Sequence, residues 1–244
     1  MPLSPAAEGP RSRSDGPLRM MCVPHAGSGA GVYRPWQRNP PSPALQVVPI
    51  QLPGREEEFT APCYRSVEEA AHGIAGRMAE TAGSAPFLVF GHSLGAVLAY
   101  EATRLLLEGG GPAPLHLVVS GSVSPRRRRP QHLPADDRQA VEQLREMTGQ
   151  PLDALDEPEL RELLLPVLRA DIGMLDRYRP APGPPLPIPF TAIRGRADAS
   201  VPAADWRDWE HYTSEAFRAV EMPGGHMYLT DSWPAVWRTV EALV

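Results

Sequence analysis

Short apolar runs alternate with amphipathic segments along the first half of this 244-residue chain. The apolar runs have the length of single strands and few polar residues, which is typical of strands buried on both faces of a sheet. Helical periodicity extends over 66–82, opened by a capping box of Ser66 and Glu69, and again over 96–107. Strands that alternate with helices predict an α/β fold with a mostly parallel central sheet flanked by helices. The four predicted strands cover 18–23, 46–50, 86–90 and 115–120.

The alternation breaks after the fourth strand and resumes near residue 190. Between about 122 and 187 the sequence shows helical patterns at 137–148 and 157–168, followed by a proline-rich stretch. We expect this segment to be a helical lid insertion, because a lid over an active site would explain so long an interruption of the sheet. No internal repeat or second domain is indicated, so residues 18–244 are interpreted as one domain. The remaining strands and helices are expected at 190–194, 203–212, 217–221 and 233–243.

The first 17 residues are rich in proline, serine, glycine and arginine and contain no apolar stretch. We therefore expect a disordered tail at 1–17 rather than a signal peptide or an anchor. No apolar run approaches the roughly 18 residues of a membrane span, so a soluble, cytoplasmic protein is expected. The net charge of −5 argues against a nucleic-acid-binding protein. Two cysteines, Cys22 and Cys63, are too few for a disulfide framework.

The motif Gly-His-Ser-Leu-Gly at 91–95 lies between the apolar run 86–90 and the helical segment 96–107. Gly-x-Ser-x-Gly between a strand and a helix is typical of the sharp turn that exposes a nucleophilic serine in α/β-hydrolases. The motif alone is weak, and its alternative is a structural turn serine in a nucleotide-binding α/β fold. The flanking strand and helix favour Ser93 as a nucleophile, which needs an adjacent base for activation.

The acid and the base should follow the serine in that order, in loops at the ends of strands. His226 fits, because it lies in a Pro-Gly-Gly-His sequence after a late strand. Asp198 fits in the loop after the strand 190–194, where its task would be to orient the imidazole. Asp205 and Asp208 are rivals that we interpret as surface charges of a helix. The other candidates precede the serine or lie in helices or in the insertion: His25, His72, His92, His132, His211, Asp171 and Asp176.

An oxyanion formed in acyl transfer needs two backbone N–H donors. Leu94, directly after the serine, would supply one of them. The other is expected from a glycine-rich loop after an early strand, and Ala26 in Pro-His-Ala-Gly-Ser-Gly at 24–29 is the candidate. Alone this loop would be a plain turn, but beside the other groups the functional interpretation is favoured. The residues by themselves thus predict an acyl-transfer hydrolase.

With these motifs and several others the chain resembles the type II thioesterases that accompany polyketide synthases and nonribosomal peptide synthetases. The resemblance extends from about 21 to 229 and depends on the joint order and spacing of motifs that are weak singly. They are Val-Pro-His-Ala-Gly at 23–27 with Tyr33 and Trp36, Leu-Pro-Gly-Arg-Glu at 52–56, Phe-Gly-His-Ser-Leu-Gly-Ala at 90–96 with Tyr100 and Glu101, Leu-Leu-Pro at 164–166 with Leu-Arg-Ala-Asp at 168–171, Gly195 to Asp198, Trp209, and Pro-Gly-Gly-His at 223–226.

The resemblance implies an α/β-hydrolase fold with Ser93, Asp198 and His226 as catalytic triad. It implies hydrolysis of acyl thioesters on the phosphopantetheine arm of acyl or peptidyl carrier proteins, which removes stalled or aberrant acyl units. It also implies a monomer without metal or other cofactor, since the pantetheine belongs to the substrate. The chain departs from the family pattern at Leu94, where many relatives have Met, and at Met227, where Phe is common.

Two further groups of residues have a functional and a plain interpretation, and both interpretations stay open. Met174, Leu175 and Tyr178 are candidates to line an acyl pocket under the insertion, with packing inside the lid as the equal alternative, and Met227 is a candidate for the pocket wall near His226. A run of basic residues could dock an acidic carrier protein, although such runs are more often solvated loops. The run consists of Arg126, Arg127, Arg128 and Arg129.

Three other functions are compatible with the same residues. A general carboxylesterase or lipase would keep the triad but prefer oxygen esters. An acyltransferase would pass the acyl group to an amine or alcohol, or cyclise it, and the lack of a fused carrier domain favours hydrolysis in trans over that function. A binding module with a degenerate hydrolase fold is the third, and the presence of all three triad residues speaks against it.

Overall fold

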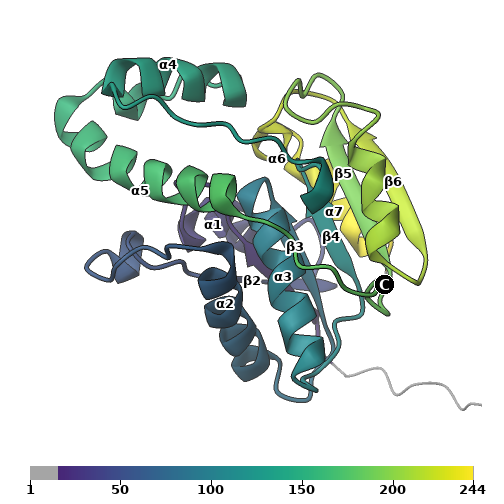
Figure 1. The fold of residues 1–244 in the computed structure, drawn as a ribbon. Helices are drawn as coiled ribbons and strands as arrows, with labels where there is room; N and C mark the ends of the chain where they lie inside the picture. The colour runs from purple at the N-terminus through teal and green to yellow at the C-terminus, as the bar shows by residue number, and fades with distance from the viewer. Residues whose placement is uncertain (1–15, 244) are drawn as a thin grey trace, which may run out of the picture.

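The computed structural model describes residues 16–243 and contains one six-stranded sheet. The strand order is β2-β1-β3-β4-β5-β6, and every neighbouring pair is parallel (Figure 1). The predicted parallel sheet is therefore confirmed, while the tail expected at 1–17 lies almost wholly outside the described residues. The strands are β1 (Leu18–Val23), β2 (Leu45–Pro49), β3 (Phe87–His92), β4 (Leu117–Ser120), β5 (Phe190–Gly195) and β6 (Phe217–Met222).

Alternate side chains of each central strand enter two different cores. In β1, Met21 and Val23 pack into one apolar cluster, whereas Met20 and Cys22 pack into the other. A strand buried on both faces has no polar positions, which explains why the strand segments appear in the sequence as continuous apolar runs. All carboxyl ends of the strands meet at one edge of the sheet, because all strands are parallel.

Helices cover both faces of the sheet (Figure 1). One face packs against α2 (Val67–Ala82) and α3 (Leu94–Glu108), and the other against α1 (Arg34–Arg38), α6 (Tyr228–Asp231) and α7 (Trp233–Glu241). The capping residue expected for α2 is present, since the hydroxyl of Ser66 accepts a hydrogen bond from the backbone N–H of Glu69 at 3.1 Å. The short α1 and α6 have too few residues to show a helical period in the sequence.

Residues 121–189, here called the insertion, connect β4 to β5 and contain the helices α4 (Asp137–Thr148) and α5 (Pro158–Arg177). Figure 1 shows α5 crossing above the first turns of α3, with α4 outside it. Side chains of α4 and α5 form a small apolar cluster of their own. The insertion contacts the rest of the molecule through α5, whose Met174 and Leu175 pack into the main core, and through its first residues, where Arg126 and Arg127 pair with Asp208. Its two remaining elements are short 3-10 helices, η3 (Pro125–Arg127) and η4 (Asp153–Leu155).

Two expected helices differ from the structure in length. The helix expected to end near 168 continues through α5 to Arg177, because Ile172 and Leu175 extend its buried face. The helix expected at 203–212 is a shorter 3-10 helix, η5 (Trp206–Tyr212), in which Trp206 and Trp209 are buried. No helix among residues 16–243 combines the length and the apolarity needed to cross a membrane.

Candidate active site

Ser93 lies between the end of β3 and the start of α3 with φ 57° and ψ −117°, a region that a non-glycine residue enters only under strain. The turn is so tight that a Cβ on Gly91 would lie 2.1 Å from the carbonyl oxygen of Gly95. A Cβ on Gly95 would lie 2.3 Å from the carbonyl oxygen of Val23. Both glycines of the motif are thus needed for close backbone contacts, and the turn projects the Ser93 hydroxyl outward from the edge of the sheet.

The three side chains singled out in the sequence meet at this edge. His226 Nε2 lies 3.1 Å from Ser93 Oγ, and His226 Nδ1 lies 2.8 Å from Asp198 Oδ2. Ser93 comes from the end of β3, Asp198 from the loop after β5 and His226 from the loop after β6. In this arrangement the serine hydroxyl can donate to Nε2 while Nδ1–H donates to the carboxylate.

Ser200 is a fourth member of this network that the sequence did not reveal. Its hydroxyl donates to Asp198 Oδ1 at 2.6 Å and lies 3.0 Å from His226 Nδ1, and its backbone N–H donates to the same carboxylate oxygen at 3.0 Å. Burial would raise the pKa of Asp198, but hydrogen bonds and charge attraction from His226 and hydrogen bonds from Ser200 leave that pKa below its ordinary value. Asp198 is therefore ionised and held in one orientation.

His92 lies behind the imidazole of His226, with 5.3 Å between the two ring centroids. It is fully buried, and its Nδ1 lies 2.9 Å from Ser120 Oγ. Burial, together with the neighbouring His226 and His25, lowers the pKa of His92 well below its ordinary value. A neutral His92 adds no positive charge beside His226.

The two expected oxyanion donors both border the same cavity as Ser93. Ala26 N–H makes no hydrogen bond with the residues that the structure describes. Leu94 N–H lies in the first turn of α3, where backbone N–H groups have no partner within the helix. Both donors are thus available to a ligand.

A buried ion pair links the loop of Ala26 to the insertion. Asp171 of α5 accepts the backbone N–H of Gly27 at 2.8 Å and binds Arg55 through two nitrogens at 2.6 and 2.9 Å. Burial would lower the pKa of Arg55, but the hydrogen bonds and charge of Asp171 outweigh it and raise that pKa. Gly27 has φ +77°, and a Cβ there would lie 2.5 Å from Leu168 of α5. The loop and the helix are consequently packed without space between them.

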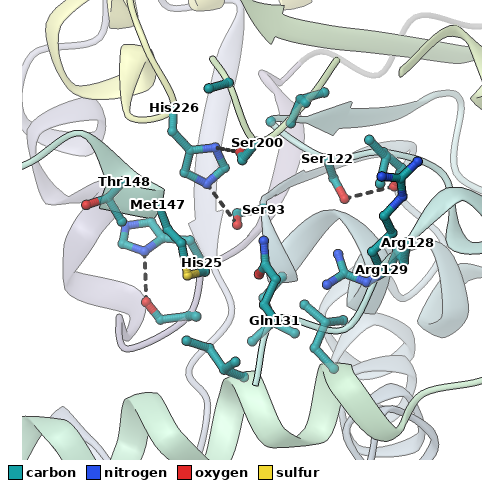
Figure 2. A pocket seen from close by; sticks show the side chains of 18 of the residues that line it. His25, Ser93, Ser122, Arg128, Arg129, Gln131, Met147, Thr148, Ser200 and His226 are labelled. Atoms are coloured by element: carbon teal, nitrogen blue, oxygen red, sulfur yellow. Dashed lines mark hydrogen bonds between the residues drawn. The ribbon is translucent and has the colours of Figure 1, made fainter. Parts of the chain in front are cut away.

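A cavity of about 330 Å³ opens beside Ser93 (Figure 2). Leu175 and Met227 are among its lining residues, whereas Met174 and Tyr178 are not. Met174 is buried in the main core, and the Tyr178 hydroxyl donates to Glu101. These two residues therefore do not line the pocket, and they pack into the main core rather than within the insertion. The apolar wall that belongs to the insertion consists of Leu144, Met147, Leu168, Ile172 and Leu175.

The arginine run divides into paired and unpaired side chains. Arg126 binds Asp208 through two nitrogens, and Arg127 Nε lies 3.2 Å from the same carboxylate. Asp208 is only 5% exposed, so its interpretation as a surface helix charge is wrong. Arg127, Arg128 and Arg129 also border the cavity. Part of the charge expected to face a partner is thus neutralised within the molecule.

A family model described as the thioesterase domain matches residues 19–244. The chain belongs to the thioesterase family. Thioesterase PikA5 of Streptomyces venezuelae is 33% identical over 222 residues, which cover 88% of this chain and 77% of that protein. The gramicidin S biosynthesis protein GrsT of Aneurinibacillus migulanus is 31% identical over 218 residues, covering 88% of this chain and 84% of that protein.

Solved structures give the same result. The thioesterase RedJ of the prodiginine pathway of Streptomyces coelicolor has a TM-score of 0.86 and 32% identity, with 100% of this chain and 97% of that chain covered. The type II thioesterase BorB of the borrelidin cluster has a TM-score of 0.84 and 28% identity, with 96% and 95% covered. These findings confirm the resemblance to type II thioesterases, the α/β-hydrolase fold and the predicted enzyme class, a hydrolase of thioesters.

Proposed function

We propose that this thioesterase hydrolyses acyl thioesters on the phosphopantetheine arm of carrier proteins and so clears stalled or aberrant acyl units during polyketide or nonribosomal peptide synthesis. The observation that carries the proposal is the continuous chain of contacts from Asp198 through His226 to Ser93 at the mouth of a covered cavity. The relatives and structural neighbours from such pathways support it. Its partner is an acyl or peptidyl carrier protein, met by a monomeric enzyme in the cytoplasm.

In the first half of the proposed reaction His226 Nε2 takes the proton of Ser93, and Ser93 Oγ attacks the thioester carbonyl. Asp198 keeps Nδ1–H pointed toward itself and stabilises the imidazolium. The oxyanion is stabilised by the N–H groups of Ala26 and Leu94. The imidazolium then gives its proton to the departing thiolate of the pantetheine arm, which leaves an acyl ester on Ser93.

In the second half a water molecule replaces the thiol. His226 takes a proton from this water, which attacks the acyl ester, and the same two N–H groups stabilise the second oxyanion. Collapse of that intermediate releases the carboxylic acid and returns the proton to Ser93. Every proton transfer in this scheme uses His226, and no metal or cofactor takes part.

The insertion acts in this proposal as a lid that shapes the acyl pocket. Its apolar side chains and Ser93 line the same cavity of about 330 Å³. That volume suits a short acyl group and the end of the phosphopantetheine arm. A covered site excludes bulk water, which strengthens the interactions with the oxyanion.

The direct test is release of acetyl, propionyl and longer acyl groups from a phosphopantetheinylated carrier protein. Wild type is compared with Ser93→Ala, and an oxygen ester of matched chain length serves as control substrate. We expect rapid release from the carrier protein, loss of release in Ser93→Ala and slow cleavage of the oxygen ester. Cleavage of the oxygen ester alone would show a general esterase, and transfer to an added amine or alcohol in place of hydrolysis would show an acyltransferase.

A further inference from the structure

Arg128 stands apart from the two arginines that precede it. Arg126 and Arg127 both pair with Asp208, whereas Arg128 forms no ion pair and no side-chain hydrogen bond with a described residue. Its Nε is buried without a partner. It lies on the wall of the cavity that contains Ser93, and Figure 2 shows it across from His226.

The surroundings of Arg128 leave its charge poorly compensated. Burial lowers the pKa of Arg128 to about 10, and the more distant carboxylate of Asp176 offsets that effect only in part. Asp176 is already engaged, since it accepts the backbone N–H of Gln131 at 2.7 Å. The guanidinium is still charged at neutral pH, and because its terminal nitrogens have no partner among the described residues, they can donate hydrogen bonds to a ligand in the cavity. An apolar group there would remove water from the guanidinium and give nothing in return.

The cavity has two unlike walls. The wall from α4 and α5 is mainly apolar and includes Leu144, Leu168 and Ile172, with Thr148 as its polar member. Another part of the lining carries Arg128 and Arg129, which Figure 2 shows on the far side of the cavity from His226, and Arg127 also borders the cavity. A substrate that matches both walls is apolar on one side of the thioester and negatively charged on the other. Guanidinium groups bind carboxylate and phosphate oxygens through paired N–H donors.

We propose that Arg128, assisted by Arg129 at the rim, forms an anion subsite that binds a carboxylate or phosphate group of the acyl thioester substrate. This inference rests on the proposed function. Two groups of such a substrate have this chemistry: the free carboxylate of a dicarboxylic acyl unit and the phosphate of the pantetheine arm. Either would supply the hydrogen bonds that Arg128 lacks in the protein itself.

Four thioesters separate the two sources. Malonyl and 3-methylbutanoyl groups have the same number of non-hydrogen atoms and the same branching, but only the first is charged. Each is prepared on pantetheine and on 4′-phosphopantetheine, and kcat/KM is measured for wild type, Arg128→Gln and Arg128→Lys. Arg238→Gln, which changes an exposed arginine of α7 far along the chain, is the matched control.

We expect Arg128→Gln to lower the ratio of kcat/KM for an anionic compound over the doubly neutral one by roughly 10- to 100-fold, the value of a hydrogen-bonded charged contact. Arg128→Lys should restore part of the ratio, and Arg238→Gln should leave it unchanged. If Arg128→Gln lowers kcat/KM for malonyl thioesters of both pantetheine and 4′-phosphopantetheine, the subsite binds the acyl carboxylate. If Arg128→Gln lowers kcat/KM for both acyl groups only when they are attached to 4′-phosphopantetheine, the subsite binds the phosphate of the arm. Equal effects on all four compounds, or none, would overturn the proposal.

A measurement of binding affinity tests the subsite without requiring the enzyme to hydrolyse the compounds. The same four compounds are titrated by calorimetry into Ser93→Ala and into Ser93→Ala/Arg128→Gln, with thermal unfolding to verify that both fold. If wild type hydrolyses none of the compounds, the proposed function fails. A selective loss of affinity for the anionic compounds would then still support the subsite, and equal affinities would overturn it even in an active enzyme.

Discussion

The edge of the sheet and the insertion are held together in different ways. At the edge, Ser93, Asp198 and His226 each follow the end of a parallel strand, so the backbone of the sheet brings them together. The insertion, in contrast, is joined to the molecule by contacts between side chains far apart in sequence. They include the buried ion pair of Arg55 with Asp171 and apolar residues such as Met174 that pack into the main core. The position of the three side chains therefore depends on strand order, and the position of the insertion depends on long-range side-chain contacts, a buried ion pair among them.

The largest effect should come from the contact between Asp198 and His226. Asp198→Asn replaces an acceptor with a group that can donate to Nδ1, which favours the wrong tautomer of the imidazole. We expect kcat for thioester hydrolysis to fall about 10,000-fold with little change in thermal stability. Asp231→Asn, an exposed acid on α6, is the control and should keep full activity. A loss of less than tenfold in Asp198→Asn would show that another acid orients the histidine.

The ion pair of the insertion should give the next largest effect, on stability. Arg55→Met leaves Asp171 charged and buried, and we expect it to cost about 3–5 kcal/mol in urea unfolding. Arg55→Met/Asp171→Asn should be more stable than Arg55→Met, because no buried charge remains and the amide oxygen can still accept Gly27 N–H.

The control for this pair is Arg77→Met, which breaks the more exposed pair of Arg77 and Glu58. It should cost less than about 1 kcal/mol. Equal costs for Arg55→Met and Arg77→Met would mean that the buried pair does not hold the insertion, and the contrast between the two regions would lose its basis.

A third comparison uses two glycines, Gly91 near the end of β3 and Gly76 inside α2. A Cβ on Gly91 would lie 2.1 Å from backbone oxygen, whereas a Cβ on Gly76 of α2 meets nothing within 4 Å. We expect Gly91→Ala to destabilise the protein by about 3 kcal/mol. Gly76→Ala should stabilise it by up to about 1 kcal/mol through helix propensity. Unfolding midpoints measure both, and a neutral Gly91→Ala would mean that the turn at Ser93 is not as tight as the structure has it.

The smallest effect concerns acid stability and Asp208. Burial would raise the pKa of Asp208, but hydrogen bonds from Arg126, Ser124 and Arg127 hold it at about 2. The folded pKa is thus below the unfolded value of about 3.9, so this group stabilises the fold above about pH 4. That stabilisation is lost as the pH falls toward about 2. The difference in Tm between wild type and Asp208→Asn should therefore be largest near neutral pH and shrink on acidification, whereas a constant difference would contradict the pairing.

Sequence patterns predicted the parts of the molecule whose structure is local. The continuous apolar strands and the turn at Ser93 follow from short-range rules. The chain order of serine, acid and histidine in this class of hydrolase located Asp198 and His226, although these contacts are long-range. Other long-range contacts left no such signal. Nothing in the local sequence indicates that Asp208 is buried under Arg126, or that the Tyr178 hydroxyl is bound to Glu101. Ser200 was also missed, although a serine two residues after an acid is a common turn partner.

The carboxylate of Asp171 is shared between Arg55 and the N–H of Gly27, and this sharing makes two equilibria interdependent. Lifting α5 away would take from the loop of Ala26 the acceptor that fixes its backbone. By thermodynamic reciprocity, a ligand that stabilises the packing of α5 against this loop also stabilises the loop, and a ligand bound to the loop stabilises the packing of α5.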